Sequence, residues 1–468
     1  MLNNTTYHHA LSSPALENKK FSRCQSPPKD GNWHKKTIEW ICPLELAVQI
    51  SNSTYKENWI FLYSGLFEQI PNSKSYIGLY PKNEIISDDF NDLERSLKES
   101  DEKYFGYLGY ELKNCLEDLK NSEKSFIDLP NLWMIKFNLI LEFDHHTKKI
   151  SIFTVMPELD FLNWLEQFRK SPSGTSEEKL STQKIKTLNC NFSKSNYLKK
   201  VKSIQKNIVN GDIYQANLTR KFFGEFLEKP KNPFNIFQNL NQKSPANYSA
   251  FLKLGENYII SSSPELFLTI DENGQAKSSP IKGTAKRFLN KSLDEESIKR
   301  LKNSPKEQAE NLMIVDLVRN DLSKNCLTNS VKVENLFKVS HYKTLHHLSS
   351  DIVGSKKPES TALDVVKSCF PAGSMTGAPK IKAMEICEDL EKQDRGVYSG
   401  AIGLIGSDEC ELSVVIRTLI IKDDKFEFQV GGAITFDSEA QKEWQETINK
   451  AKGIAKTLGI KLADLKGI

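Results

Sequence analysis

The chain has 468 residues, of which 38% are hydrophobic and 26% charged, a balance typical of folded globular proteins and not of disordered chains. Its net charge of +4 arises from 64 basic and 60 acidic residues, which provides no global field for binding nucleic acid or an anionic membrane. The eight cysteines form no C-x-x-C pair, and no apolar run is long enough to span a membrane. These features favour a cytoplasmic protein with reduced thiols that acts on a small molecule.

In chain order, the sequence divides into four segments. Residues 1–35 are polar and show no periodicity, so we expect them to be disordered. Residues 36–170 alternate short apolar runs with polar turns, which predicts an antiparallel sheet with a few helices. A polar stretch over residues 171–187 is the best linker in the chain, and residues 188–468 follow it. Length alone favours about three domains of roughly 150 residues each.

The region after the linker is predicted to mix helices and strands. Apolar residues recur at helical spacing from Tyr197 to Ile208, and Gly211 stands where a left-handed cap would end that helix. Alternating apolar residues then predict strands at residues 213–219, 258–260, 411–421 and 426–430.

Two further predicted helices each carry a pair of glutamates. Ser304 and Glu307 bracket a proline as in a capping box, which predicts a helix to about residue 321, and a last helix is expected over residues 438–458. Glu310 lies on the same helix face as Glu307, and the last helix presents a second pair in the same way. This second pair consists of Glu443 and Glu446.

Such pairs usually belong to a solvated surface. The residues after Glu310 form an apolar face, however, which should be buried and pull the neighbouring carboxylates inward. Buried carboxylates that converge repel one another, and a hard cation relieves that repulsion. A ligand set of oxygens without Cys or His favours Mg²⁺ over Zn²⁺. The sequence therefore predicts a magnesium site between the two helices.

Lys282 lies in the segment Pro280-Ile-Lys-Gly-Thr284, where flexible Gly283 and Thr284 let backbone N–H groups approach an anion. An isolated lysine usually lies on the surface, and the segment does not match a phosphate-binding P-loop. A free lysine is also a poor nucleophile, because its pKa is near 10.4. Burial, a nearby metal ion, or the cations Lys286 and Arg287 would each lower that pKa.

Three other polar residues stand in apolar surroundings. Glu265, at a predicted strand end, is a candidate general acid if it is desolvated. His346 and His347 are adjacent and point in different directions, so at most one faces a site. Arg417 interrupts an apolar run and needs an anion if it is buried, either a protein carboxylate or a ligand carboxylate.

Taken together, these segments resemble the chorismate-utilising enzymes, which include anthranilate synthase component I, aminodeoxychorismate synthase component I, and the isochorismate and salicylate synthases. The resemblance covers nearly all of residues 196–458, and residues 106–111 resemble the family's amino-terminal region. Its motifs are Gly211-Asp-Ile-Tyr-Gln-Ala-Asn217, Ser263-Pro-Glu265, Pro280-Ile-Lys-Gly-Thr284, Ala309-Glu-Asn-Leu-Met313, Pro371-Ala-Gly-Ser-Met-Thr-Gly-Ala-Pro-Lys380, Tyr398-Ser-Gly400 and Glu443-Trp-Gln-Glu-Thr447.

The resemblance implies an α+β fold in which two packed antiparallel β-sheets are surrounded by helices. The amino-terminal and catalytic regions are then intertwined in one unit, in place of three domains. The family also implies that chorismate and Mg²⁺ lie in the cleft between the sheets. Glu310 and Glu446 would bind the metal directly, with Glu307 and Glu443 beside them partly through water.

The resemblance further implies the roles of the catalytic groups. Lys282 would add to the substrate ring, Glu265 would protonate the leaving hydroxyl, and His347 would orient or polarise it. Tyr398 and Arg417 would hold the enolpyruvyl carboxylate. Ala433 stands where relatives usually carry a third glycine beside the carboxylate site. The residues expected to bind substrate are Gln215, Gly283, Thr284, Tyr398, Arg417, Gly431, Gly432 and Lys450.

Two positions separate the branches of the family. Isochorismate and salicylate synthases carry a water-activating lysine where Gln215 stands, which argues against hydration. Anthranilate synthases usually carry alanine where Lys282 stands. The resemblance thus implies component I of aminodeoxychorismate synthase, which converts chorismate and ammonia to 4-amino-4-deoxychorismate for para-aminobenzoate and folate synthesis.

The source of ammonia is expected to be a separate subunit. The sequence shows no Cys-His-Glu glutaminase set on a nucleophile elbow, so a glutamine amidotransferase partner is implied. Two other interpretations stay open. An anthranilate synthase would release pyruvate from the same substrates, and a non-catalytic subunit would bind chorismate without consuming it.

Overall fold

The computed structural model describes residues 34–467 except positions 71, 121, 158, 159, 162, 164, 167–182, 343 and 344. The predicted disordered segment 1–35 therefore lies outside the described residues apart from its last two, which already belong to strand β1 (His34–Glu39). The predicted linker 171–187 is likewise mostly outside them. Its last three residues begin strand β7 (Ile185–Cys190).

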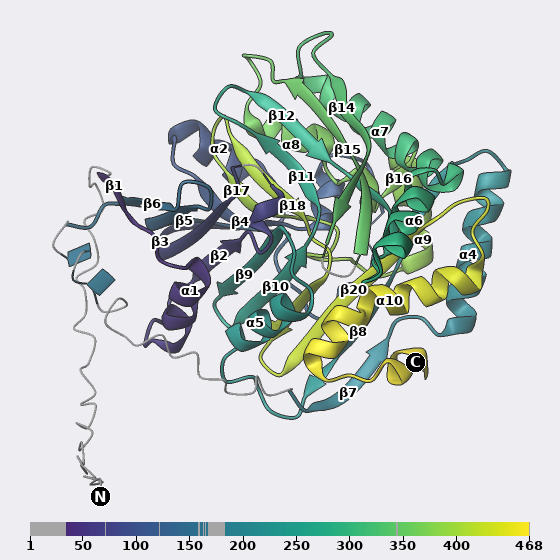
Figure 1. The fold of residues 1–468 in the computed structure, drawn as a ribbon, viewed down its shortest axis with the longest axis horizontal. Helices are drawn as coiled ribbons and strands as arrows, with labels where there is room; N and C mark the ends of the chain where they lie inside the picture. Colours follow the sequence, from purple (N-terminus) through teal and green to yellow (C-terminus); the bar gives the residue numbers. More distant parts are fainter. Residues whose placement is uncertain are drawn as a thin grey trace, which may run out of the picture.

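All the strand pairings within the described chain are antiparallel, and they form two layers that share the long strand β5 (Figure 1). The first layer runs in the order β1, β6 (Lys149–Thr154), β5 (Leu132–Asp144), β3 (Lys74–Ser87), β2 (Trp59–Tyr63), β9 (Tyr248–Leu254), β10 (Asn257–Ser263), β19 (Thr418–Lys422), β20 (Lys425–Ile434), β8 (Gln215–Phe226) and β7. The second runs in the order β4 (Tyr104–Leu108), β17 (Ala401–Ile405), β18 (Cys410–Val414), β11 (Leu266–Ile270), β12 (Gln275–Ser279), β15 (Leu345–Ser355) and β14 (Lys332–His341). Strand β13 (Ile281–Lys286) follows β12 along the same edge of β15, and the short β16 (Gly377–Ala378) pairs with β8.

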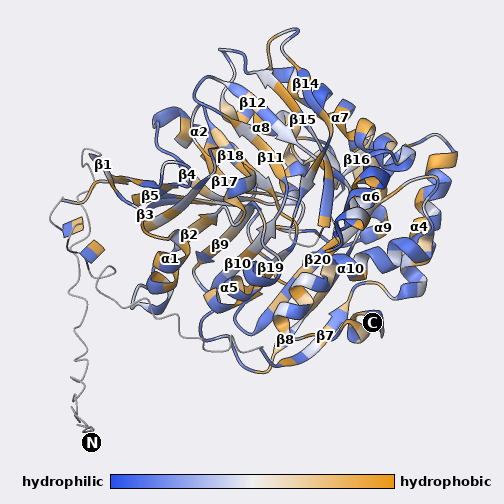
Figure 2. Cartoon of the chain, in the orientation of Figure 1, coloured by the Kyte–Doolittle hydropathy of each residue, from blue (hydrophilic) through white to orange (hydrophobic). Residues whose placement is uncertain are grey.

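Helices cover the outer faces of both layers. Figure 2 shows hydrophilic and hydrophobic residues side by side on these helices, as expected where one face packs on a sheet and the other meets solvent. Within the described residues, no helix is both long and apolar enough to cross a membrane. The helices are α1 (Pro43–Asn52), α2 (Asn91–Glu99), α4 (Lys194–Val209), α5 (Phe234–Lys243), α6 (Lys291–Lys302), α7 (Pro305–Asn325), α8 (Ala362–Cys369), α9 (Lys380–Glu391), α10 (Ala440–Leu458) and α11 (Leu462–Gly467), with short 3₁₀ turns η1 (Phe67–Gln69), η2 (Tyr110–Cys115) and η3 (Gly373–Met375).

The hydrophobic cores follow the alternation of side chains along the strands. In β2, Phe61 faces the core beneath α1, α5 and α10, whereas its neighbour Ile60 faces a core between the two layers. That central core contains Leu252 from the first layer and Ile402 from the second. A third core, which includes Ile314, lies beneath α2, α7 and α8. The expected two-layer α+β fold is confirmed, and both sequence regions contribute strands to each layer.

The predicted helices are found with small differences at their ends. Gly211 adopts the left-handed φ of 86° just after α4, as its position predicted. Helix α7 begins after Ser304, whose hydroxyl accepts the Glu307 N–H at 3.4 Å, and it continues to Asn325. The helix predicted over residues 438–458 is α10, which begins at Ala440, and the short α11 follows it.

The predicted strand over residues 411–421 is wrong as a single element. The chain instead forms β18 and β19 in different layers, with a break between Val414 and Thr418. Arg417 has a φ of 51° in this break, a conformation that extended strands do not contain. The apolar run continues across the break because both flanking strands are buried. The predicted strand at residues 213–219 begins later, at Gln215, and extends to Phe226.

Candidate active site

Lys282 lies on β13, where its ammonium group is enclosed by residues from several elements. Its Nζ donates a hydrogen bond to the backbone oxygen of Ser374 in η3, at 3.0 Å. Burial lowers the pKa of Lys282, and the nearby Lys450 adds to this effect, while the carboxylates of Glu310 and Glu265 oppose it. The lowered pKa increases the fraction of neutral amine, which is the nucleophilic form.

Two other cations considered from the sequence do not explain the lowered pKa of Lys282. Lys286 and Arg287 are both exposed at the end of β13. The guanidinium of Arg287 turns away to donate to the backbone oxygen of Tyr342, at 2.9 Å. Burial is therefore the main physical cause.

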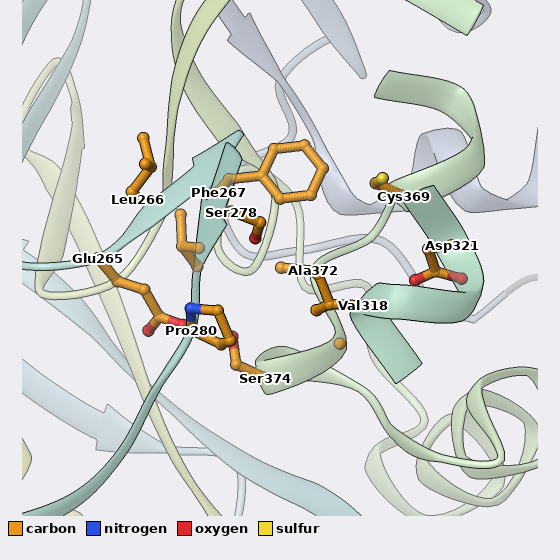
Figure 3. A pocket seen from close by; sticks show the side chains of 12 residues that line it. Glu265, Leu266, Phe267, Ser278, Pro280, Val318, Asp321, Cys369, Ala372 and Ser374 are labelled. Atoms are coloured by element: carbon orange, nitrogen blue, oxygen red, sulfur yellow. The ribbon is translucent and has the colours of Figure 1, made fainter. Parts of the chain in front are cut away.

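Glu265 stands between β10 and β11, and only 4% of its surface is exposed. Its carboxylate accepts the backbone N–H of Ile281 at 3.2 Å, which places it next to Lys282. Burial raises the pKa of Glu265, opposed by the hydroxyl of Ser374 and the charge of Lys282. In Figure 3 the Glu265 carboxyl group points toward Pro280 and Ser374. It borders a small pocket, whose far side is formed by α7 and the segment before η3.

His347 lies on β15, where its ring is held between two polar side chains from other segments. Its Nδ1 lies 3.4 Å from Thr284 Oγ1, and its Nε2 lies 3.4 Å from a guanidinium nitrogen of Arg417. Burial and the charge of Arg417 lower the pKa of His347 to about 3, so the ring is neutral. Because the guanidinium can only donate, Nε2 accepts and the proton lies on Nδ1. His346 instead faces Asp294, so one histidine of the pair faces the site, as expected.

Arg417 and Tyr398 approach the same region from neighbouring segments. The Ser399 N–H donates to the backbone oxygen of Val415 at 2.9 Å, which fixes the Tyr398 segment beside the break that holds Arg417. Tyr398 is buried, and burial raises its pKa. In the described part of the chain, Arg417 forms no ion pair with a carboxylate, and burial lowers its pKa. Its guanidinium instead contacts the neutral ring of His347.

The four predicted metal-binding glutamates face one another from α7 and α10. Burial raises the pKa values of Glu307, Glu310 and Glu443, and the neighbouring carboxylates raise them further. The pKa of Glu446 is lowered instead, because Lys450 forms an ion pair with it at 2.7 Å. Within the described residues, no three of these carboxylates are already drawn together as a metal-binding group.

Glycine backbones leave space around these carboxylates. A Cβ atom added to Gly283, whose φ is 93°, would lie 2.9 Å from Glu307 Oε2. At Gly432 it would lie 3.4 Å from Glu443 Oε2 and 3.7 Å from Glu446 Oε1. Mutually repelling, partly buried oxygen donors beside open backbone fit a hard divalent cation such as Mg²⁺.

The remaining predicted substrate-binding residues lie on β8, β20 and α10. Lys450 donates to the backbone oxygen of Gly431 at 2.8 Å, which links α10 to β20. Gln215 is 1% exposed at the start of β8, and its Oε1 has no hydrogen-bond partner among the described residues. Ala433, on the same strand as Gly431, is only half-buried. The charges of Glu265, Glu310, Glu446 and Lys450 all act on Lys282, so these residues lie together, whereas Gln215 lies at the start of β8, where it pairs with Ala378 of β16.

Residues 57–456 match the model of the chorismate-binding enzyme family. The chain belongs to this family of chorismate-binding enzymes. It is 33% identical to anthranilate synthase component 1 of Lactococcus lactis over 359 residues, which cover 75% of this chain and 78% of the relative. It is 35% identical to aminodeoxychorismate synthase component 1 of Escherichia coli over 354 residues, which cover 75% and 76% of the two chains. The crystal structure of anthranilate synthase component I from Streptococcus pneumoniae superposes with a TM-score of 0.73 and 29% identity, covering 82% of this chain and 92% of that one.

Sequence reasoning missed the part played by Ser374 in this chorismate-binding enzyme. Its backbone oxygen accepts a hydrogen bond from the Lys282 ammonium group, and its hydroxyl lies beside Glu265. Ser374 was visible within the motif of residues 371–380, but a small residue between glycine and methionine carries no chemical signal of its own. A backbone acceptor can be found only from the fold.

Proposed function

We propose that this chorismate-binding enzyme is component I of an aminodeoxychorismate synthase. It would replace the C4 hydroxyl of chorismate with an amino group, using ammonia released from glutamine by a partner amidotransferase. The observation that carries the proposal is the enclosure of Lys282 beside Glu265, with the lysine pKa lowered and the carboxyl pKa raised. Both shifts favour the neutral forms, which are the amine that attacks and the acid that protonates the leaving group.

In the proposed reaction, the neutral amine of Lys282 adds to C2 of the ring. The ring double bonds shift, the C4–O bond breaks, and the hydroxyl leaves as water with the proton of Glu265. The Glu265 carboxylate then takes the proton released from the lysine nitrogen. Ammonia next adds at C4, the double bonds return, and the C2–N bond breaks to free Lys282 as Glu265 protonates the lysine nitrogen and then takes a proton from the new ammonium group. The enolpyruvyl group remains on the product.

The neighbouring residues would orient chorismate for these steps. Tyr398 and Arg417 would bind the enolpyruvyl carboxylate, which would give the unpaired guanidinium its anion. Neutral His347 presents Nε2 on the side of Arg417 and would orient the leaving hydroxyl. Glu307, Glu310, Glu443 and Glu446 would hold Mg²⁺, which supplies positive charge for the ring carboxylate when bound.

An anthranilate synthase is the second candidate, because relatives of nearly equal identity carry that name. The two reactions differ in their products, since an anthranilate synthase eliminates pyruvate to form an aromatic ring. A partly buried lysine with a lowered pKa at this position favours amination without elimination. In anthranilate synthases the corresponding residue is usually alanine.

The test is an incubation of the purified chain with chorismate, Mg²⁺ and ammonium, followed by chromatography of the products and a coupled assay for pyruvate. We expect 4-amino-4-deoxychorismate and no pyruvate. Lys282→Ala should abolish the product, whereas Lys286→Ala, an exposed lysine on the same strand, should not. Stoichiometric pyruvate with anthranilate would establish the second candidate. No consumption of chorismate would support the non-catalytic interpretation.

A further inference from the structure

A turn of the chain from Lys392 to Ser399 carries Tyr398 between α9 and β17. Three of its residues, Lys392, Gly396 and Ser399, have φ values of 57°, 65° and 67°. Two of these are not glycine, and such residues take left-handed conformations only where the surroundings hold them. The turn therefore depends on contacts from outside itself.

Backbone bonds join Glu123 to the start of this turn, and its middle is held by Glu111, a residue of η2 in the amino-terminal region. Its Oε1 accepts the backbone N–H of Arg395 at 2.8 Å, and its Oε2 accepts that of Gly396 at 2.9 Å. Only 7% of Glu111 is exposed. The N–H of the preceding Tyr110 donates to the backbone oxygen of Gly396 at 2.8 Å, so the two peptides that flank Gly396 are both fixed. A carboxyl group is well suited here, because each of its two oxygens faces one N–H group.

The side chain of Arg395 extends this arrangement into the site. Its guanidinium donates to the backbone oxygen of Met375 at 2.8 Å and to that of Asn217 at 2.9 Å. It also pairs with Glu391 at 2.8 Å. Met375 directly follows Ser374, whose backbone oxygen accepts the Lys282 ammonium. The peptide held by Glu111 is thus connected both to Tyr398 and to the segment that contacts Lys282.

We propose that Glu111 is a positioning residue for chorismate binding, which fixes the turn of Tyr398 and, through Arg395, the segment of Ser374. The substrate part of this inference rests on the proposed function. Glu111 touches neither the substrate nor the reacting atoms. It makes the amino-terminal region a structural part of the carboxylate site, although that site is built from residues after position 188.

The decisive variant is Glu111→Gln, which keeps the shape of the side chain. Its amide has one acceptor oxygen, so its NH₂ group must face one of the two backbone N–H groups and leave it without a partner. We expect the KM for chorismate to rise about tenfold while kcat changes less than about threefold, because binding is affected more than chemistry. Glu111→Asp keeps two acceptor oxygens and should recover part of the affinity.

A second readout does not require activity. Hydrogen exchange followed by mass spectrometry should show faster exchange of residues 392–400 in Glu111→Gln, with β20 unchanged. The matched control is Glu84→Gln, since Glu84 also lies in the amino-terminal region and accepts two N–H groups, from Asn58 and Trp133. This control should alter neither readout.

The outcomes separate the two proposals. Wild-type exchange in residues 392–400 of Glu111→Gln, or an equal effect of Glu84→Gln, would overturn the positioning role. Faster exchange with an unchanged KM would overturn its link to substrate. If the wild-type chain consumes no chorismate, the proposed function fails, and the exchange result alone decides whether Glu111 fixes the turn.

Discussion

At the scale of single residues, burial changes the acid–base behaviour of the site in two opposite directions. It lowers the pKa of Lys282 and raises that of Glu265, and each group partly offsets the shift of the other. Raising the pH through the Glu265 value removes the proton that the leaving hydroxyl needs. Lowering the pH through the Lys282 value protonates the nucleophile. Activity should therefore fall on both sides of an optimum.

The first residue-scale prediction concerns the general acid. Glu265→Gln keeps the oxygen that accepts the Ile281 N–H but removes the acidic proton. We expect kcat to fall by a factor of about 10² to 10⁴, with the KM for chorismate within about threefold of wild type. Steady-state kinetics with saturating ammonium measure both constants. A kcat within about fivefold of wild type would show that another group protonates the hydroxyl.

The second residue-scale prediction concerns stability and pH. Burial raises the pKa of Glu111 from 4.5 to about 7. Because the folded state holds this proton more tightly, the stabilisation is present below pH 4.5 and is lost as the pH rises toward 7. As the pH rises across this window, the contribution of Glu111 to the free energy of unfolding should fall by up to about 1.4 kcal/mol per pH unit.

Glu111→Gln removes this titration. Urea unfolding of wild type and variant between about pH 5 and 7 measures the free energy of unfolding at each pH. This free energy should decline less with rising pH in the variant than in the wild type. Equal slopes would mean that the folded-state pKa of Glu111 is near its ordinary value.

At the scale of elements, the sequence predicted the helices better than the strand break. Ser304 marked the start of α7 because a capping residue acts locally, and α10 was visible from its apolar face. The break at Arg417 was missed, since both flanking strands are buried and their apolar residues read as one run. The signal was Arg417 itself, which was identified as an interruption but assigned to the interior of a strand.

Strand β13 offers an element-scale prediction through Gly283. Gly283→Ala places a methyl group 2.9 Å from Glu307 Oε2, whereas Gly255→Ala, also at positive φ, meets no atom within 4 Å. Both variants should lose about 1 to 2 kcal/mol of stability from the backbone conformation. Only Gly283→Ala should raise the Mg²⁺ concentration needed for half-maximal activity, by about tenfold or more.

Mg²⁺ titrations of chorismate consumption, with thermal unfolding of both variants, separate the steric effect from the backbone effect. An equal Mg²⁺ requirement in the two variants would contradict the placement of Glu307 at the metal site.

At the scale of the whole molecule, the amino-terminal and catalytic regions share their sheets and cores. Strand β2 pairs with β9, and β4 pairs with β17, so each layer contains strands from both regions. Chain length suggested separate domains. It could not reveal the shared sheets, because length carries no information on pairing between distant segments. The intertwined arrangement was predictable only through the resemblance of the motifs to a family.

This sharing predicts one cooperative unfolding transition. Trp59 lies in β2 and Trp444 lies in α10, so tryptophan fluorescence reports on both regions. Fluorescence and circular dichroism should report the same midpoint of unfolding. Replacing either tryptophan with Phe should leave a single transition, whose midpoint shifts only by the effect of the substitution on stability. Two separated transitions would show that the regions are independent domains.

The most direct test of the central claim is intact-protein mass spectrometry after incubation with chorismate and Mg²⁺ in the absence of ammonia. The wild-type chain should gain the mass of chorismate less one water, because Lys282 remains attached to the ring until ammonia displaces it. The Lys282→Ala variant should show no such gain. A wild-type chain that turns over chorismate with ammonia, yet shows no adduct under slow turnover without it, would contradict covalent catalysis by Lys282.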